Sequence, residues 1–222
     1  MRRLIPFAVF AGAGLALLLA LGSWQVQRLS WKQDILARIE ARIDAPPVPL
    51  PEAPDPARDA YLPVTVTGAL GGAAIPVLVA HPDYGAGFRI VARLTAGDRE
   101  LLVDLGYVPE PARDQPRMAE SVTVTGNLLW PDEVDGWTPP PDPASGMWFA
   151  RDAAAMGQAL GAEPFLIVAR AIDPPQGTLP MPVGTEGIPN DHLGYAITWF
   201  GLAVAWAVMS LVLIRRMRRK GD

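Results

Sequence analysis

Hydrophobic residues gather in two long runs, one near each end of the chain. No charged residue occurs from Leu4 to Gly22 or from Leu193 to Ile214. A helix needs about 20 apolar residues to cross the roughly 30 Å hydrocarbon core of a bilayer. The pattern therefore predicts two transmembrane helices, at residues 1–22 and 192–214.

The first run also fits a cleaved signal peptide, with Arg2 and Arg3 as its charged start and residues 20–22 as the cleavage site. Small residues recur every four positions along it, at Ala8, Gly12, Ala16 and Ala20. This spacing lets membrane helices approach closely, which favours a retained helix. We expect the row to pack on the small residues of the second run, which are Ala196, Ala203 and Ser210.

The helical pattern continues past the first span over residues 23–43, with Trp24 and Trp31 near the membrane interface. Pro46 and Pro47 end it. Six prolines in the fifteen residues 44–58 predict a stiff, extended linker rather than a folded element. A second tether rich in proline and glycine is predicted at residues 175–191.

Between these connections, residues 59–174 are rich in short β-type runs separated by Gly and Pro. These runs are "LPVTVTGAL", "IPVLVA", "FRIVARLT", "ELLVDLGYV", "SVTVTGNLL" and "PFLIVARAI". The stretch "RDAAAMGQALG" is the one clear helix, with Gly161 placed to end it. We predict one α+β domain, an open barrel or a sandwich with a helix against it. The string "VTVTG" occurs at Val64 and again at Val122, by an ancient duplication or by coincidence.

Charge predicts the topology. Seven of the 19 Lys and Arg residues lie in the short flanks outside the two spans, at residues 2–3 and 215–220. The segment from Ser23 to His192 keeps 12 basic against 22 acidic side chains, a formal charge of −10. By the positive-inside rule both termini are expected in the cytoplasm and the acidic domain outside, in the periplasm. An acidic domain also argues against a nucleic-acid partner.

The chain contains no cysteine, which excludes disulfides, thiolate metal sites and covalent c-type haem attachment. It also lacks an organelle transit peptide, so a bacterial inner membrane is the expected location. We found no nucleophile elbow, zinc-protease motif or phosphate-binding loop, and we predict that the chain is not an enzyme. His81 and Asp83 could share a metal or a proton, but a surface turn is the simpler interpretation. Asp132 and Glu133 are expected to be solvated.

The second histidine, His192, stands at the start of the second span. Its helical face carries Tyr195, Ala196, Trp199, Ala203, Trp206 and Ser210. This face is either an interfacial aromatic belt that packs on the first span, or one wall of a flat apolar slot for a cofactor. In the second interpretation His192 binds haem iron, and Arg28 and Lys32 meet the propionates. Asp191 would then orient the ring by accepting its second N–H.

Two end motifs, "LGSWQVQRLSWKQDIL" and "NDHLGYAITWFGLA", resemble the paired signatures of the Surfeit-locus family of cytochrome c oxidase assembly factors. The middle segments "GFRIVARL", "LLVDLGYVP", "VTGNLLWPDE" and "MWFARDAAAMGQALG" follow the same order. Asp191 and Gly194 depart from the usual family residues, and "VLVAHPDYGAG" matches only loosely.

The resemblance implies a protein that binds haem a transiently and assists its insertion into oxidase subunit I, with haem a synthase as a further candidate partner. It also implies that His192 is the metal ligand, and Tyr195, Trp199, Trp24 and Arg28 complete the expected haem site. One alternative is an oxidase-assembly scaffold that never binds haem. The other is a membrane-anchored exterior enzyme or sensor.

Overall fold

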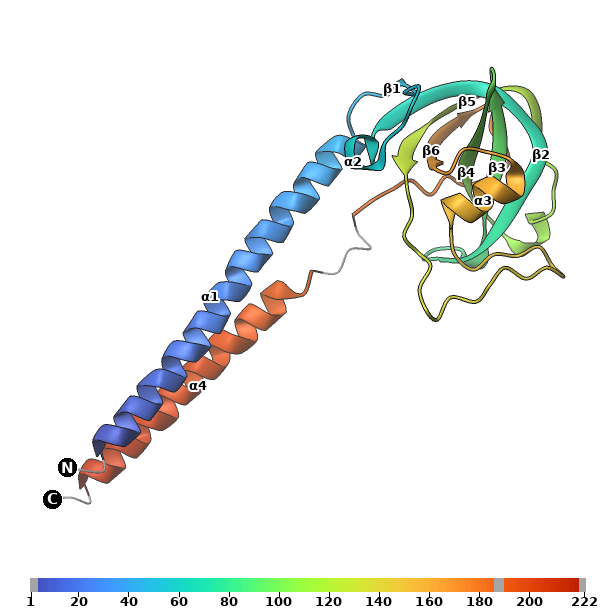
Figure 1. Cartoon of the computed structure of the whole chain (residues 1–222). Helices are drawn as coiled ribbons and strands as arrows, with labels where there is room; N and C mark the ends of the chain where they lie inside the picture. The colour runs from blue at the N-terminus through green and yellow to red at the C-terminus, as the bar shows by residue number, and fades with distance from the viewer. Residues whose placement is uncertain (1–3, 186–189, 220–222) are drawn as a thin grey trace. The chain divides into compact units, whose positions relative to one another are not determined.

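The computed structural model describes residues 4–185 and 190–219 (Figure 1). The chain divides into two compact units, one formed by residues 1–38 with 185–222 and the other by Ile39–Gly184. The first unit is helical and the second is built on a β-sheet. The predicted fold class, two apolar helices flanking a β-rich domain, is confirmed.

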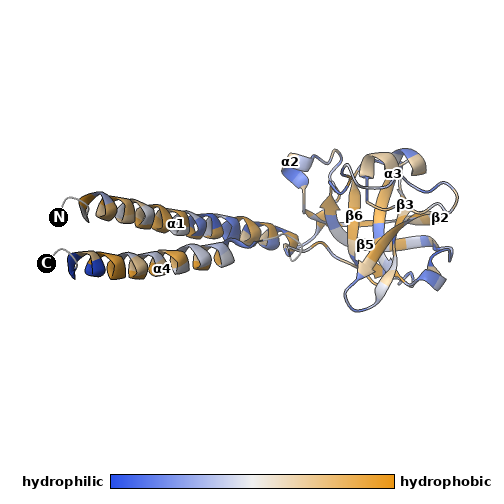
Figure 2. Ribbon diagram, turned by 90° about the horizontal axis from the view of Figure 1, so that it is seen from below, coloured by the Kyte–Doolittle hydropathy of each residue, from blue (hydrophilic) through white to orange (hydrophobic). Residues whose placement is uncertain are grey.

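The helical unit pairs α1 (Leu4–Ile43) with α4 (His192–Arg219), which run side by side in opposite directions (Figure 1). Both helices are long and apolar enough to cross a membrane, each with a mean hydropathy of 2.2 in its most apolar window. Figure 2 shows the apolar stretch of α1 giving way to a hydrophilic one toward its C-terminal half. The helix α1 continues without a break through residues 20–22, where the signal-peptide alternative places a cleavage site.

Large aromatic side chains of α4 fill notches at glycines of α1. A Cβ atom added at Gly14 would lie 2.8 Å from the ring of Trp206, and one at Gly22 would lie 2.8 Å from the ring of Phe200. The indole Nε1 of Trp206 also donates a 2.8 Å hydrogen bond to the backbone oxygen of Ala11. The two helices are therefore held here by side chains of α4 that fit against glycines of α1, and by this hydrogen bond between them.

The predicted packing of the α1 row was wrong. Its four residues, Ala8, Gly12, Ala16 and Ala20, are exposed, and a Cβ at Gly12 would have no neighbour within 4 Å. The prediction for α4 was better, because Ala196 and Ala203 are buried at 3% and 2% exposure. The facing row of α1 instead contains Ala11, Gly14, Gly22 and Gln25. The rings of Trp206 and Phe200 fit against α1 only where it carries glycine, at Gly14 and Gly22. The face of α1 that contains these glycines therefore turns toward α4, and the row of small residues does not.

This packing predicts a contrast between two glycines of α1. Gly14→Leu should separate the helices, because the new side chain occupies the space of the Trp206 ring, whereas Gly12→Leu should be tolerated. Disulfide cross-linking between cysteines introduced at Leu18 and Ala203 measures the approach of the spans. Equal cross-linking yields in the two variants would contradict the packing described here.

The β-unit is a closed barrel. Its strands are β1 (Val48–Pro49), β2 (Pro63–His81), β3 (Gly85–Ala96), β4 (Arg99–Val108), β5 (Met118–Leu129) and β6 (Leu166–Asp173). They are hydrogen-bonded in the order β1-β2-β3-β4-β6-β5, and β5 pairs again with β2. Of the predicted open barrel or sandwich, the barrel is therefore the right architecture, although its ring of pairings is closed.

Closure depends on the length of β2, which the sequence pattern divides into two runs. Its first half pairs with β5 and its second half with β3. The register shifts between Gly68 and Leu70 in the pairing with β5, and between Leu70 and Ala74 in the pairing with β3. The two "VTVTG" strings pair antiparallel with each other, with Val66 opposite Val124. Cross-strand threonine pairs flank this centre, since Thr65 and Thr125 approach to 3.2 Å and Thr67 and Thr123 to 2.9 Å through their hydroxyls.

Two apolar clusters stabilise the barrel. The larger fills the interior and includes the fully buried Leu94, Leu101 and Ile167. The smaller lies on the outer surface of the barrel, where α3 (Ala153–Leu160) covers β4 and places Met156 against Leu102. The predicted helix is confirmed: Asp152 caps its start by accepting from the Ala155 N–H at 3.0 Å, and Gly161 ends it at φ 64°.

The proline-rich connections are more structured than predicted. Residues 44–58 contribute the strand β1, which pairs in parallel with β2, and the start of the short helix α2 (Pro56–Asp59). Part of the predicted tether 175–191 packs on the barrel, because Leu179 and Tyr107 exchange backbone hydrogen bonds of 2.7 and 2.9 Å. Gly106 permits this approach, since a Cβ there would collide with the Leu179 carbonyl. Residues 186–189 of the predicted tether lie outside the described part of the chain.

Candidate functional site

His192 is the first residue of α4, and its ring contacts the other helix. The Nδ1 atom lies 2.8 Å from the Oε1 atom of Gln25, and Gln25 is buried at 8% exposure. Gln25 occupies the packed face of α1 that also carries Gly22 and Leu18. The contact therefore joins the first residue of α4 to a buried residue of α1.

This hydrogen bond determines the chemistry of the imidazole. The amide atom that faces the ring is the oxygen, which accepts hydrogen bonds, so this arrangement favours the tautomer in which Nδ1 carries the proton. In a neutral ring the Nε2 atom then keeps its lone pair, which is the form in which histidine binds metal ions. In this tautomer, Nε2 is the ring nitrogen with a free lone pair at the start of α4.

The sequence prediction for the orienting partner was wrong. Asp191 is exposed, and the partner on Nδ1 is Gln25 from a different helix. The sequence analysis treated Gln25 only as a polar position of the helical extension. The sequence did contain a signal for this role: Gln25 follows Gly22 by three residues, so both lie on one face of the helix, and Gly22 allows that face to pack closely.

The other predicted site residues lie on one flank of the helix pair. Gln25 and His192 define the facing sides, and each residue turns a helix by about 100°. For two antiparallel helices, this rotation places Trp24 and Arg28 of α1 on the same flank as Tyr195 and Trp199 of α4. The edge-to-face contact of Phe10 with Trp206, with ring centroids 5.6 Å apart, follows the same relation further along.

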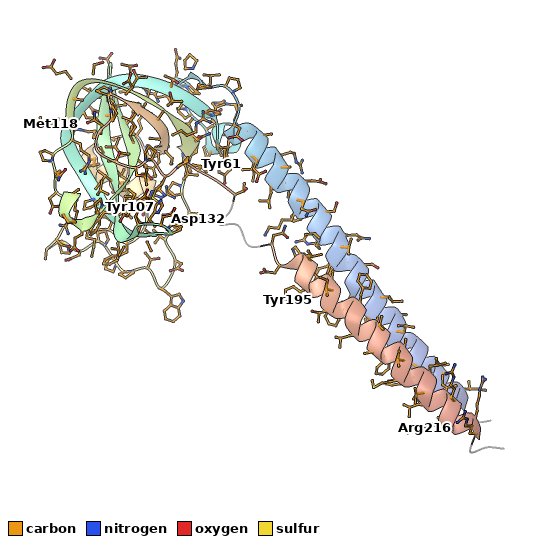
Figure 3. All side chains as sticks on the ribbon, turned by 180° about the vertical axis from the view of Figure 1, so that it is seen from behind. Tyr61, Tyr107, Met118, Asp132, Tyr195 and Arg216 are labelled. Carbon is orange, nitrogen blue, oxygen red and sulfur yellow. The ribbon has the colours of Figure 1, made fainter. Side chains whose placement is uncertain are left out.

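These side chains differ in exposure. Trp24 is 52% exposed and Tyr195, in the first turn of α4 (Figure 3), is 56% exposed, whereas Trp199 is half-buried. The guanidinium of Arg28 lies 4.3 Å from the ring centroid of Trp31, so its charge remains at the surface of α1. The structure therefore joins His192 directly to Gln25, and it leaves two aromatic surfaces and one cation open beside them.

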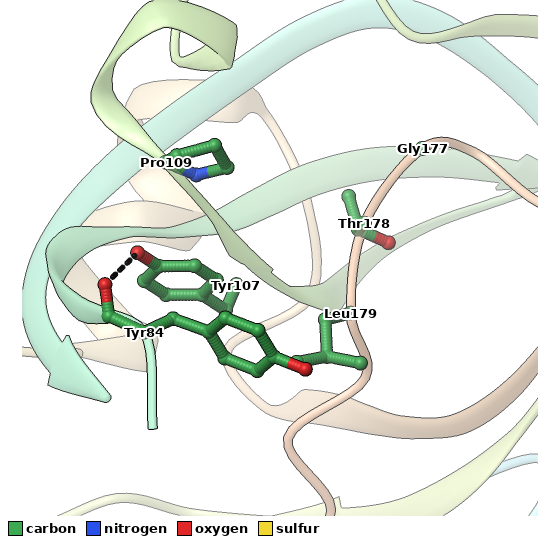
Figure 4. Close-up of a pocket in the computed structure, with 6 residues that line it drawn as sticks. All are labelled: Tyr84, Tyr107, Pro109, Gly177, Thr178 and Leu179. Atoms are coloured by element: carbon green, nitrogen blue, oxygen red, sulfur yellow. Dashed lines mark hydrogen bonds between the residues drawn. The ribbon is translucent and has the colours of Figure 1, made fainter. Parts of the chain in front are cut away.

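The second histidine has a different environment. In the turn after β2, the Nδ1 atom of His81 accepts a 3.1 Å hydrogen bond from the backbone N–H of Asp83. Its ring packs 4.8 Å from Tyr84 and 5.3 Å from Tyr107, measured between centroids. The two tyrosines line a cavity of about 470 Å³ together with Leu179 (Figure 4). His81 and Asp83 form the surface turn of the simpler interpretation, and residues 4–185 and 190–219 contain no metal-type cluster of three His, Cys, Asp or Glu.

Comparison with known proteins gives the same assignment as the motifs. The model of the SURF1 family matches residues 13–204, which include both Gln25 and His192. The chain belongs to the SURF1 family. Surfeit locus protein 1 of Xenopus tropicalis is 30% identical over 91% of this chain and 71% of its own length. The human Surfeit locus protein 1 is 30% identical over 83% and 70%, and a SURF1-like protein of Rickettsia felis is 26% identical over 90% and 93%.

The barrel of this SURF1 chain contains a charged network that the sequence analysis missed. Asp104 lies on the side of β4 that faces away from the barrel interior, and it is fully buried there. Its carboxylate accepts from Arg89 at 2.8 Å and from Arg151 at 3.0 Å. Arg89 also donates to the Met181 carbonyl at 2.7 Å, and Arg151 pairs with Glu133. Asp104 therefore ties two connecting segments to the sheet, the β5–α3 connection that contains Glu133 and Arg151 and the segment after β6 that contains Met181.

Asp132 and Glu133 are both exposed, as expected, but the sequence did not show that the carboxylate of Glu133 is also paired with Arg151. Burial alone would raise the pKa of Glu133, but the hydrogen bonds and the charge of Arg151 outweigh it and lower the pKa. A lowered pKa in the folded state means that the pairing stabilises the fold at neutral pH. This stabilisation is lost as the pH falls through the pKa of the folded protein.

Proposed function

We propose that this SURF1-family chain is a non-enzymatic assembly factor for haem–copper cytochrome c oxidase. It binds haem a at the membrane through His192 and assists the insertion of that haem into subunit I. The observation that carries the proposal is the hydrogen bond from Nδ1 of His192 to Gln25, since it leaves Nε2 able to bind iron. Membership of a family of cytochrome oxidase assembly factors supports the wider role.

His192 and the residues beside it have the chemical groups that a haem requires. Imidazole nitrogen is a common axial ligand of haem iron, and the exposed rings of Trp24 and Tyr195 offer flat apolar surface. Arg28 supplies a positive charge for a propionate on the same flank. Haem a is a cargo in this proposal, and it contributes an iron atom that accepts one nitrogen ligand. One protein ligand at the end of a helix holds such a cargo weakly enough to release it.

The proposal places the protein in a bacterial inner membrane, with both termini in the cytoplasm and the barrel in the periplasm. The two apolar helices and the basic terminal flanks support this placement. The membrane is also where a haem with an apolar tail partitions. Subunit I is the recipient of the haem, and haem a synthase is the candidate donor.

The test is the visible spectrum of the purified full-length protein. The protein should carry a haem a Soret band when it is made in cells that produce haem a, and no such band when it is made in cells that lack haem a synthase. A colourless protein from haem a-producing cells that still restores oxidase assembly would refute haem binding and favour the scaffold alternative.

The topology gives a separate prediction. A reporter inserted at Gly97 should be active only outside the cytoplasm, because this turn between β3 and β4 is open and belongs to the acidic domain. A reporter at the C-terminus should report the cytoplasm. A mature protein whose N-terminal sequence starts at Ser23 would overturn the two-span topology and support the signal-peptide alternative.

A further inference from the structure

Gln25 is an unusual residue for its place. It is buried on the packed face of α1, three residues after Gly22, which receives the ring of Phe200. A buried amide costs free energy unless its polar atoms find partners, and this cost rises where lipid replaces water. The partner of its oxygen is the Nδ1 atom of His192, 2.8 Å away. A residue that served packing alone would not need this oxygen.

We propose that Gln25 is a positioning residue, which fixes His192 in the tautomer with the proton on Nδ1 and so directs Nε2 toward an incoming iron atom. The tautomer assignment stands on the hydrogen bond alone. The role toward iron rests on the proposed function.

The mechanism follows from the donor and acceptor inventory of the two side chains. The oxygen of Gln25 has lone pairs and no hydrogen, so it selects the ring form that donates from Nδ1. The same bond limits rotation of the imidazole about its side-chain torsions, because Gln25 belongs to the other helix. In metal sites, a hydrogen bond to the second ring nitrogen raises the basicity of the ligand, and its loss typically weakens metal affinity by about 10- to 100-fold.

The two histidines of this chain provide an internal comparison. Nδ1 of His81 accepts a hydrogen bond from the Asp83 backbone, which requires the proton on Nε2. Nδ1 of His192 donates. The structure therefore assigns opposite tautomers to the two rings, and a single spectrum of the protein can test both assignments.

The first experiment needs no haem. The full-length protein is labelled with ¹⁵N only in histidine, placed in lipid nanodiscs, and studied by nuclear magnetic resonance at a pH where both rings are neutral. His81→Gln identifies the two sets of signals. We expect a proton on Nδ1 in His192 and on Nε2 in His81. A wild-type His192 with its proton on Nε2 would overturn the proposal.

Variants separate positioning from packing. Gln25→Met keeps the length and helix preference of the side chain but removes the strong acceptor, and Gln25→Glu keeps an acceptor. Gln27→Met is the matched control, since Gln27 is exposed on the same helix. The tautomer of His192 should change in Gln25→Met and remain in Gln25→Glu and Gln27→Met. An unchanged tautomer in Gln25→Met would show that Gln25 has no positioning role.

The second experiment adds haem a to the same proteins. Gln25→Met should bind it roughly tenfold more weakly and lower the iron–histidine stretching frequency of the ferrous form in resonance Raman spectra. Gln25→Glu should raise this frequency, because a carboxylate draws the proton further from Nδ1. Identical frequencies in wild type, Gln25→Met and Gln25→Glu would overturn the role toward iron. Failure of the wild type to bind haem a would refute the proposed function and the role toward iron, while the tautomer result would still stand.

Discussion

His192→Ala is expected to abolish or greatly weaken haem a binding while the protein remains inserted and folded. The change removes the nitrogen that the hydrogen bond with Gln25 leaves free for iron. It leaves in place the contacts of aromatic rings with glycines that hold α4 against α1, including the contact of Trp206 with Gly14. Trp199→Ala should weaken binding less, because a stacked ring adds apolar contact but no bond to iron.

The measurement is Soret absorbance per mole of purified protein from cells that make haem a. His81→Ala is the matched control and should retain full occupancy. Added imidazole should partly restore the band in His192→Ala, because it can occupy the space of the missing ring. Full occupancy with an unshifted spectrum in His192→Ala would show that another residue binds the iron, and His81 would be the remaining histidine to test.

The sequence predicts elements well where the pattern is local. Both spans stand out as uncharged runs, and the helix at residues 153–160 carries its own start and stop signals in Asp152 and Gly161. The strands are visible as β-branched runs. His192 can be placed at the start of the second span because the uncharged run begins at the next residue, Leu193. Each of these features depends on neighbours within a few positions.

Features that depend on distant partners were missed or misjudged. The two runs of β2 form one strand because β5 and β3 pair with its two halves, and the sequence of β2 alone cannot show this. The proline-rich stretch at residues 44–58 includes a strand because β2 offers it an edge. The packed face of α1 is decided by where Phe200 and Trp206 fall on α4.

The candidate site divides in the same way. Residue type and position suffice to select His192, but the partner of its ring lies 167 residues away in the chain. The neighbouring Asp191 was chosen as that partner because it is adjacent and acidic. Adjacent residues on a helix point in different directions, about 100° apart, so a residue on a facing helix is better placed to reach the ring.

Asp104→Asn is expected to destabilise the barrel strongly, by about 3–5 kcal/mol. Asp104 is fully buried and neutralises Arg89 and Arg151, whose side chains are 12% and 13% exposed. The amide keeps the shape of the carboxylate but removes its charge, so one buried guanidinium loses its counter-ion.

The segments of Arg151 and Met181 should then detach from β4, because both reach the strand through this network. Unfolding of the full-length protein in detergent by guanidinium chloride, followed by far-ultraviolet circular dichroism at the β-sheet band, measures the loss. Asp98→Asn removes the same charge in the open β3–β4 turn and should leave the free energy of unfolding within about 0.5 kcal/mol of wild type. Equal stability of the two variants would show that the buried network does not hold the barrel together.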